Sequence, residues 1–334
     1  MRPKNILRYK YVMPQLGSRN HLLTMPQSPD LTASVIFRYI YALRPWSWTA
    51  TFIPLIFTST LLSAEKQDVH TDVTVYLIFI TLCIQAAANA INTVEDFHYG
   101  VDTDKQTGGD RALVDKTVCP TALHRLGYIL LVAGCVGVRQ LILSLETTQH
   151  DYKLASSIFA AGTTLAVMYT APPLRLKYRG LGDVAVFLCF GPLLMQFCAV
   201  IFTGEIQPSV YAYTVPIGVM TVMILHGNNT RDIENDANAG ITTLAVCLGF
   251  EGSRIFYMIM LLVTYGAVFY LAYEEYVGLV LVALSIPIAA DLCVSFTKEK
   301  VHNMDENTAK FHMMFGLLMA AGIKATPYIE EYMR

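Results

Sequence analysis

The chain has 334 residues, of which 54% are hydrophobic and only 15% carry a charge. An ordinary soluble domain has about 25% charged residues, so this composition excludes a soluble globular enzyme. The net charge of −2 gives no sign of a nucleic-acid-binding surface. Continuous apolar runs such as residues 73–94 are long enough to cross a bilayer, and they lack the alternation of a β-barrel. We therefore predict an all-α, polytopic membrane protein.

The chain divides into a short polar tail and a long apolar domain. Residues 1–30 are polar and basic and contain four prolines, which predicts a disordered tail, and residues 31–334 form the membrane domain. Residues 31–44 predict a short interfacial helix. Nine transmembrane helices are then expected at roughly 46–64, 73–97, 121–145, 153–171, 182–203, 209–232, 254–273, 276–297 and 308–326.

The distribution of basic residues predicts the orientation. The tail and the connections after the second, fourth, sixth and eighth spans, with their flanks, hold 19 of the 24 Lys and Arg residues. Connections rich in Lys and Arg stay in the cytosol. The N-terminus and these connections are therefore expected to be cytosolic.

Asparagine and aspartate gather at the cytosolic end of the second predicted span. Asn92 and Asp96 are spaced to share one face of the helix. Gly100 is expected to end that helix and to let Asp102 fold back toward the same point. A solvated loop at the membrane edge is the alternative explanation for such a cluster.

A matching cluster follows the sixth predicted span. It contains Asn228, Asn229, Asp232 and Asp236, and the first, third and fourth of these are spaced to lie on one helical face. Carboxylates this close repel each other, and a bound cation would relieve the repulsion. Oxygen ligands without His or Cys favour Mg²⁺, which commonly completes its shell with substrate phosphates. Two matched clusters on one membrane face favour the metal site over solvated loops.

Basic side chains accompany both acidic clusters. Arg111 follows the first cluster, and Lys177 lies in the connection between the fourth and fifth spans. Both can bind the anionic oxygens of a diphosphate. For Lys177 the alternative explanation is a plain signal of cytosolic orientation.

These motifs resemble those of the UbiA superfamily of intramembrane aromatic prenyltransferases. The first reads Asn92-x3-Asp96-x5-Asp102 and the second Asp232-x3-Asp236. Residues 107–115, 169–183 and 228–245 are most similar to the animal members that form menaquinone-4. The resemblance covers about residues 35–326 and implies nine helices around one central cavity.

The resemblance also implies a reaction and roles for the motif residues. A prenyl group, expected to be geranylgeranyl, would pass from its diphosphate to the ring of a reduced naphthoquinone such as menadione. Two Mg²⁺ ions are expected, one held by Asp96 and Asp102 and the other by Asp232 and Asp236. The remaining substrate contacts would come from Asn92, Arg111, Tyr169, Lys177, Asn228, Asn229 and Arg231.

Other functions stay open at this point. The acceptor could be 4-hydroxybenzoate, as in ubiquinone synthesis, or haem B. A non-catalytic isoprenoid sensor or a cation transporter would also use membrane carboxylates, although a transporter should carry them near the middle of its spans. The resemblance further implies hydroxymethylglutaryl-CoA reductase as a partner. It also suggests the endoplasmic reticulum and Golgi as the location, with mitochondria as the alternative.

Overall fold

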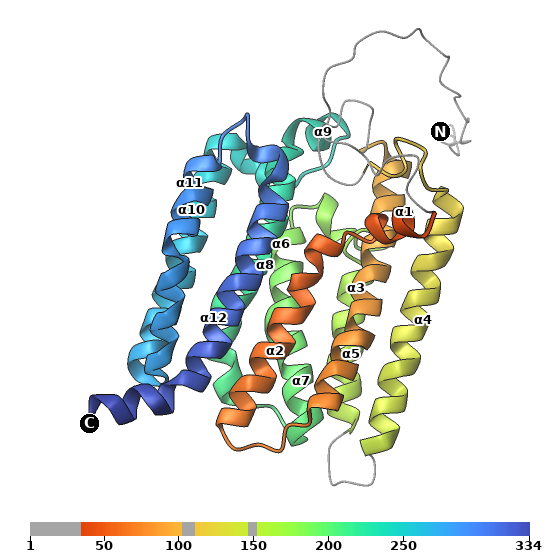
Figure 1. Ribbon diagram of the computed structural model, residues 1–334. Helices are drawn as coiled ribbons and strands as arrows, with labels where there is room; N and C mark the ends of the chain where they lie inside the picture. Colours follow the sequence, from red (N-terminus) through yellow and green to blue (C-terminus); the bar gives the residue numbers. More distant parts are fainter. Residues whose placement is uncertain (1–34, 102–110, 146–151) are drawn as a thin grey trace, which may run out of the picture.

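The computed structural model describes residues 35–101, 111–145 and 152–334, and the regular structure in these ranges is helical (Figure 1). The predicted tail and Asp102 lie outside the described residues. The α-helices are α1 (Val35–Ala42), α2 (Thr49–Ala64), α3 (Thr71–Tyr99), α4 (Pro120–Leu145), α5 (Tyr152–Val167), α6 (Gly182–Leu188), α7 (Leu194–Thr203), α8 (Pro208–Arg231), α9 (Ile233–Asn238), α10 (Leu244–Glu274), α11 (Ile286–Ser295) and α12 (Met304–Met333). Short 3₁₀ or π segments are η1 (Pro45–Trp48), η2 (Leu176–Tyr178), η3 (Cys189–Leu193), η4 (Val277–Ser285) and η5 (Val301–Asn303).

Helices cover all nine predicted spans, but not all nine qualify as spans. In the described ranges, seven helices are long and apolar enough to cross a membrane. The predicted span at 153–171 is the shorter helix α5, with 16 residues. The predicted span at 308–326 lies within α12, which is 30 residues long but carries charged residues along its length. A multi-pass membrane protein is confirmed, whereas the count of nine spans is not.

The long helices stand side by side, with α10, α11 and α12 at one edge and α3, α4 and α5 at the other (Figure 1). Helices α1 and α9 lie at one end of the bundle, and the chain finishes at the opposite end (Figure 1). Large apolar side chains are buried between α2, α8, α10 and α12, and a second cluster joins α3, α4 and α7. Leu262 on α10 and Val132 on α4 are exposed on the outer surface, as expected for helices that face lipid.

Two interruptions of the helices shape the interior. Between α6 and α7 the chain widens into the π turn η3, which contains Pro192 and presents Cys189 and Phe190 to a cavity. At Gly278 the chain passes so close to α12 that an added Cβ would lie 2.0 Å from the carbonyl oxygen of Gly322. Only glycine permits that approach.

Candidate active site

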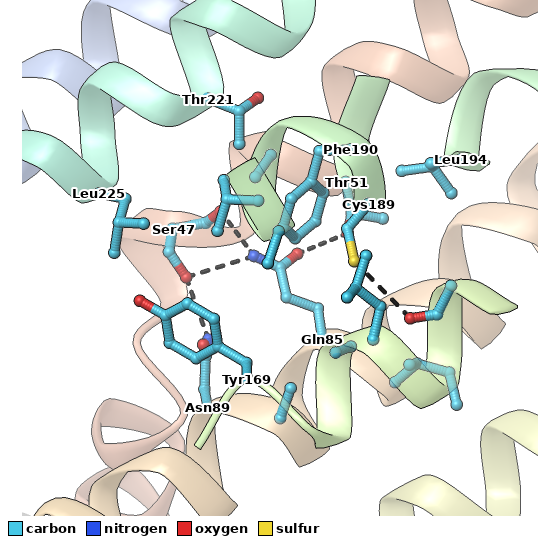
Figure 2. Close-up of a pocket in the computed structure, with 18 of the residues that line it drawn as sticks. Ser47, Thr51, Gln85, Asn89, Tyr169, Cys189, Phe190, Leu194, Thr221 and Leu225 are labelled. Carbon is cyan, nitrogen blue, oxygen red and sulfur yellow. Dashed lines mark hydrogen bonds between the residues drawn. The ribbon is translucent and has the colours of Figure 1, made fainter. Parts of the chain in front are cut away.

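A cavity lies between η1, α2, α3, α5, α6, η3 and α8 (Figure 2). Its two ends differ in chemistry. The charged end is lined by Arg44, Asn92, Lys177, Asn228 and Asp305, and the apolar part by Ile84, Ile158, Phe159, Phe190, Leu194 and Phe197. An anionic head with a long hydrocarbon tail would match this division.

Asp96, on the last turns of α3, is held by two side-chain hydrogen bonds. Only 2% of the residue is exposed, and its carboxylate is paired with Lys177 Nζ at 2.6 Å. The hydroxyl of Tyr178 donates a second hydrogen bond to it at 2.9 Å. Gly100 ends α3 in the left-handed conformation, as the sequence predicted. Asp96 is therefore a fixed, buried anion at the end of the cavity.

The loop after α5 carries Lys177 to this point. Its backbone folds back on the end of α5, where Lys177 N donates to the carbonyl oxygen of Tyr169 at 2.8 Å. Burial lowers the pKa of the Lys177 ammonium, but the carboxylates of Asp96 and Asp236 outweigh burial and raise the pKa above its usual value. Lys177 is thus a charged group inside the cavity and not a solvated loop residue.

Asn92 joins this cluster from one turn below Asp96. In the amide orientation that satisfies both neighbours, its nitrogen donates to Asp96 at 3.2 Å and its oxygen accepts from Arg44 at 3.1 Å. Arg44, which stands just before η1, was not among the predicted site residues. The basic and acidic groups of the first motif therefore form one connected network.

A one-residue turn separates two helices at the second motif. Helix α8 ends at Arg231, and Asp232 takes a non-helical conformation before the short helix α9 begins. The helical hydrogen bonds nevertheless continue on both sides of Asp232, from Asp232 N to Asn228 O at 3.2 Å and from Asp236 N to Asp232 O at 2.9 Å. As the spacing predicted, the side chains of Asn228 and Asp232 meet, with Asn228 Nδ2 donating to Asp232 Oδ2 at 3.4 Å. Asp236 is buried in α9, with only 1% of the residue exposed.

Arg231 holds the second motif together. Its guanidinium donates to both carboxylate oxygens of Asp232, at 2.9 and 2.7 Å, and to the amide oxygen of Asn228 at 2.7 Å. It also pairs with Asp305 at the start of α12, at 3.1 Å. Arg231 therefore links the end of α8 to the start of α12 through buried hydrogen bonds.

Asp236 and Asn229 supply buried oxygens without partners. Asp236 Oδ1 and Asn229 Oδ1 accept no hydrogen bond among the described residues. Burial raises the pKa of Asp236 to about 7, with Lys177 opposing this effect and Asp232 and Asp96 adding to it. The two motifs meet at one site, because Thr242, shortly after α9, donates its N–H to the carbonyl oxygen of Tyr178 at 3.4 Å, and the Tyr178 hydroxyl donates to Asp96.

Three other predicted residues have separate outcomes. Tyr169 lines the cavity, and its buried hydroxyl has no hydrogen-bond partner among the described residues. Burial raises the pKa of Tyr169, so the hydroxyl stays protonated and can donate. Arg111 pairs with Asp115 at 2.9 Å and does not line the described part of the cavity. Asp102 lies outside the described residues.

The donor set can be tested against a magnesium ion. In residues 35–101, 111–145 and 152–334, no group of three His, Cys, Asp or Glu side chains is arranged to hold a metal unaided. The unpartnered oxygens of Asp236 and Asn229 are nevertheless of the kind that Mg²⁺ prefers. Mg²⁺ commonly binds one or two carboxylates and takes its other ligands from phosphates and water. The residues present fit that mode of binding.

The family model and the similar curated sequences agree on one family. The UbiA prenyltransferase family matches residues 51–318. The chain is 33% identical to the human UbiA prenyltransferase domain-containing protein 1 over 290 residues, covering 86% of this chain and 84% of that protein. It is 32% identical to the Drosophila melanogaster homologue of that protein over 300 residues, covering 89% and 82%.

Solved structures have the same fold at low sequence identity. The apo structure of a UbiA homologue from Aeropyrum pernix matches with a TM-score of 0.63 and 15% identity, covering 83% of this chain and 97% of that one. A UbiA homologue from Archaeoglobus fulgidus bound to GPP and Mg²⁺ matches with a TM-score of 0.60 and 14% identity, covering 85% and 99%.

Proposed function

Because this chain belongs to the UbiA prenyltransferase family, we propose that it transfers a geranylgeranyl group from its diphosphate to a reduced naphthoquinone, forming menaquinone-4. The observation that carries the proposal is that both acidic motifs meet beside Lys177, which lines the charged end of a largely apolar cavity. The diphosphate would bind at the charged end, and the prenyl chain would extend along Phe159, Phe190 and Phe197. The relatives' similarity and the UbiA homologue that binds GPP and Mg²⁺ support this placement.

The residues of this chain would serve the departure of the diphosphate. Two Mg²⁺ ions, held by Asp96 with Asp102 and by Asp232 with Asp236, would supply Lewis-acid neutralisation of the developing negative charge. Lys177 and Tyr169 would donate hydrogen bonds to diphosphate oxygens from inside the cavity, and Arg231 would complement them from the second motif.

The apolar part of the cavity would protect the allylic cation. Water would capture this cation, and a lining of Ile, Leu and Phe side chains excludes water. The aromatic faces of Phe190 and Tyr169 would stabilise its positive charge. The electron-rich ring of the reduced naphthoquinone would then attack the allylic carbon and lose its ring proton.

The lining of the cavity favours a neutral acceptor over 4-hydroxybenzoate. Away from its charged end, the cavity presents neutral amides and hydroxyls, including those of Ser47, Thr51, Gln85 and Asn89. The cationic side chains that line the described cavity, Arg44 and Lys177, lie at its charged end, where the diphosphate would bind. A benzoate carboxylate placed among the neutral groups would then be unpaired, and burying an unpaired charge is costly. A hydroxylated naphthalene carries no such charge.

A competition assay tests the proposed acceptor. The purified protein is given Mg²⁺, geranylgeranyl diphosphate and equal concentrations of reduced menadione and 4-hydroxybenzoate, without oxygen. Mass spectrometry should show prenylated naphthalenediol in at least about tenfold excess, since an unpaired buried carboxylate costs well over 1.4 kcal/mol. A predominance of prenylated benzoate would contradict the proposal.

The remaining expectations are carried by resemblance and charge pattern. The N-terminus would be cytosolic, because the basic connections lie on its side. The endoplasmic reticulum and Golgi membranes, with mitochondria as the alternative, are proposed from the family resemblance alone, as is hydroxymethylglutaryl-CoA reductase as a partner. Neither sensing nor transport is needed to account for the cavity.

A further inference from the structure

A row of neutral polar side chains lines the cavity next to its charged end. Gln85, Asn89 and Asn92 follow one another along α3 at helical spacing, and all three line the cavity. Ser47 of η1 and Thr51 of α2 face them from the other side (Figure 2). Buried polar groups inside a membrane bundle are unfavourable unless they are paired. The hydrogen-bond partners of each side chain therefore show which polar atoms remain available to a ligand.

Asn89 has an amide whose orientation is fixed. Its nitrogen donates to the carbonyl oxygen of Leu43 at 2.9 Å and to the hydroxyl oxygen of Ser47 at 3.1 Å. The Leu43 carbonyl can only accept, so the amide nitrogen must face it. No donor among the described residues reaches Asn89 Oδ1, and Asn89 is only partly buried where it lines the cavity. Its oxygen is a preset hydrogen-bond acceptor.

The neighbours of Asn89 hold it rigidly. The Ser47 hydroxyl donates to the carbonyl oxygen of Arg44 at 2.8 Å, which leaves its oxygen to accept from Asn89. Gln85 Nε2 donates to the Ser47 carbonyl oxygen at 2.8 Å, and Thr51 donates to Gln85 Oε1 at 2.5 Å (Figure 2). Because each side chain is fixed by the next, the free oxygen of Asn89 cannot easily turn away.

A fixed amide oxygen favours ligands that carry a hydrogen-bond donor. It pairs with a hydroxyl, which can donate, and it repels a quinone carbonyl or an ether oxygen, which cannot. Asn89 lies seven residues before Asp96, or about 10 Å along the helix at 1.5 Å per residue. A ring bound at Asn89 would therefore lie beside the allylic carbon of a prenyl diphosphate whose head is bound at Asp96 and Lys177.

Building on the proposed function, we propose that Asn89 orients the aromatic acceptor by accepting a hydrogen bond from its ring hydroxyl. The acceptor then binds in its reduced, hydroxylated form, and the transfer step itself needs no oxidant or reductant. In that step the bond between the allylic carbon and the diphosphate oxygen breaks, and its electron pair leaves with the diphosphate. A ring carbon bonds to the allylic carbon, and the proton of that ring carbon passes to an oxygen of the released diphosphate. The hydroxyl becomes more acidic as the ring gains positive charge, so its hydrogen bond to Asn89 strengthens at that moment.

A pair of probes that differ only in the hydroxyls tests this role. They are 2-methylnaphthalene-1,4-diol, kept reduced without oxygen, and its dimethyl ether. Trp46 lines the cavity and is one of two tryptophans, so quenching of tryptophan fluorescence reports binding without turnover. The wild-type protein should bind the diol about two- to tenfold more tightly than the ether, the range of one neutral hydrogen bond.

Substitutions then assign the preference to Asn89. Asn89→Leu should bring the ratio of the two affinities close to one and should raise the KM of the diol more than that of the prenyl diphosphate. Ser47→Ala removes one of the two acceptors that fix the amide, and it should lower the ratio partway. Thr81→Val is the matched control, because Thr81 also lines the cavity from α3 but donates to the carbonyl oxygen of Leu77 at 2.6 Å. It should keep the wild-type ratio.

The outcomes separate this inference from the proposed function. An unchanged ratio in a folded Asn89→Leu protein, or an equal loss in Thr81→Val, would overturn the role of Asn89 even if prenyl transfer proceeds. A lost ratio in Asn89→Leu alone would support it. A wild-type protein that prefers the diol but transfers no prenyl group to it would contradict the proposed reaction while leaving the hydroxyl-binding position in place.

Discussion

Replacing Asp96 by asparagine is expected to lower the rate of prenyl transfer by about a hundred- to a thousandfold, the usual cost of losing one electrostatic group that stabilises a transition state. Asparagine keeps the size of the side chain and can still accept from Tyr178, which donates to Asp96 at 2.9 Å. What it loses is the negative charge that pairs with Lys177 at 2.6 Å and that would bind Mg²⁺. The turnover number at saturating substrates measures the effect.

The control for Asp96→Asn is the neighbouring acid. Glu95→Gln removes the same charge one residue away, from a side chain that is only partly buried and does not line the cavity. It should keep its activity within about twofold, since surface charges contribute little. Size-exclusion chromatography in detergent checks that both variants are folded. An Asp96→Asn protein with more than half of the wild-type turnover would exclude Asp96 from the metal site.

Replacing Lys177 by methionine is expected to lower kcat/KM for the prenyl diphosphate by roughly ten- to 150-fold. A hydrogen bond to a charged group is worth about 1.5–3 kcal/mol, and each 1.4 kcal/mol is a factor of ten. Lys177 is buried, with 6% of the residue exposed. Methionine fills much of the same space but lacks the ammonium group. The KM of the aromatic acceptor should change far less, because the acceptor is placed below the charged end of the cavity. Lys177→Arg keeps the charge but not the geometry and should be partly active.

Arg179→Met separates a diphosphate contact from an orientation signal. Arg179 lies in the same loop and contributes equally to the positive-inside bias, but its side chain is exposed. Its backbone pairs with Thr242 whatever the side chain, so the loop should keep its shape. Its kcat/KM should stay within about twofold of wild type. Equal losses in the two variants would return Lys177 to the role of a topology signal.

Local spacing accounts for part of the candidate site. Asn92 and Asp96 share a helix, so their separation in sequence fixed their separation in space. The sequence predicts the acidic second motif and a helix end near residue 232, where α8 ends at Arg231. It does not predict that Arg231 pairs with both Asp232 and Asp305. The membrane bundle followed from the length of the apolar runs, while α12 was too polar for hydropathy to decide.

Contacts between distant parts of the chain could not be read from spacing. Arg44 reaches Asn92 across 48 residues, and Asp305 reaches Arg231 across 74. Nothing in the local sequence of either residue distinguishes it from an ordinary residue at a helix end. A basic or acidic residue beside a predicted span is the only signal that could have suggested them. Lys177 could be proposed because it belongs to a basic run beside the acidic clusters, but its pairing with Asp96 could not.

The dependence of prenyl transfer on Mg²⁺ tests the central claim most directly. The purified wild-type protein is assayed with geranylgeranyl diphosphate and reduced menadione, first with Mg²⁺, then with excess EDTA, and again after Mg²⁺ is restored. Because Asp236 and Asn229 present buried oxygens without partners, the carboxylate site is expected to need the cation. Transfer should fall to background in EDTA and return fully with Mg²⁺. Near-normal transfer in EDTA would contradict the account of two carboxylate motifs that act through magnesium.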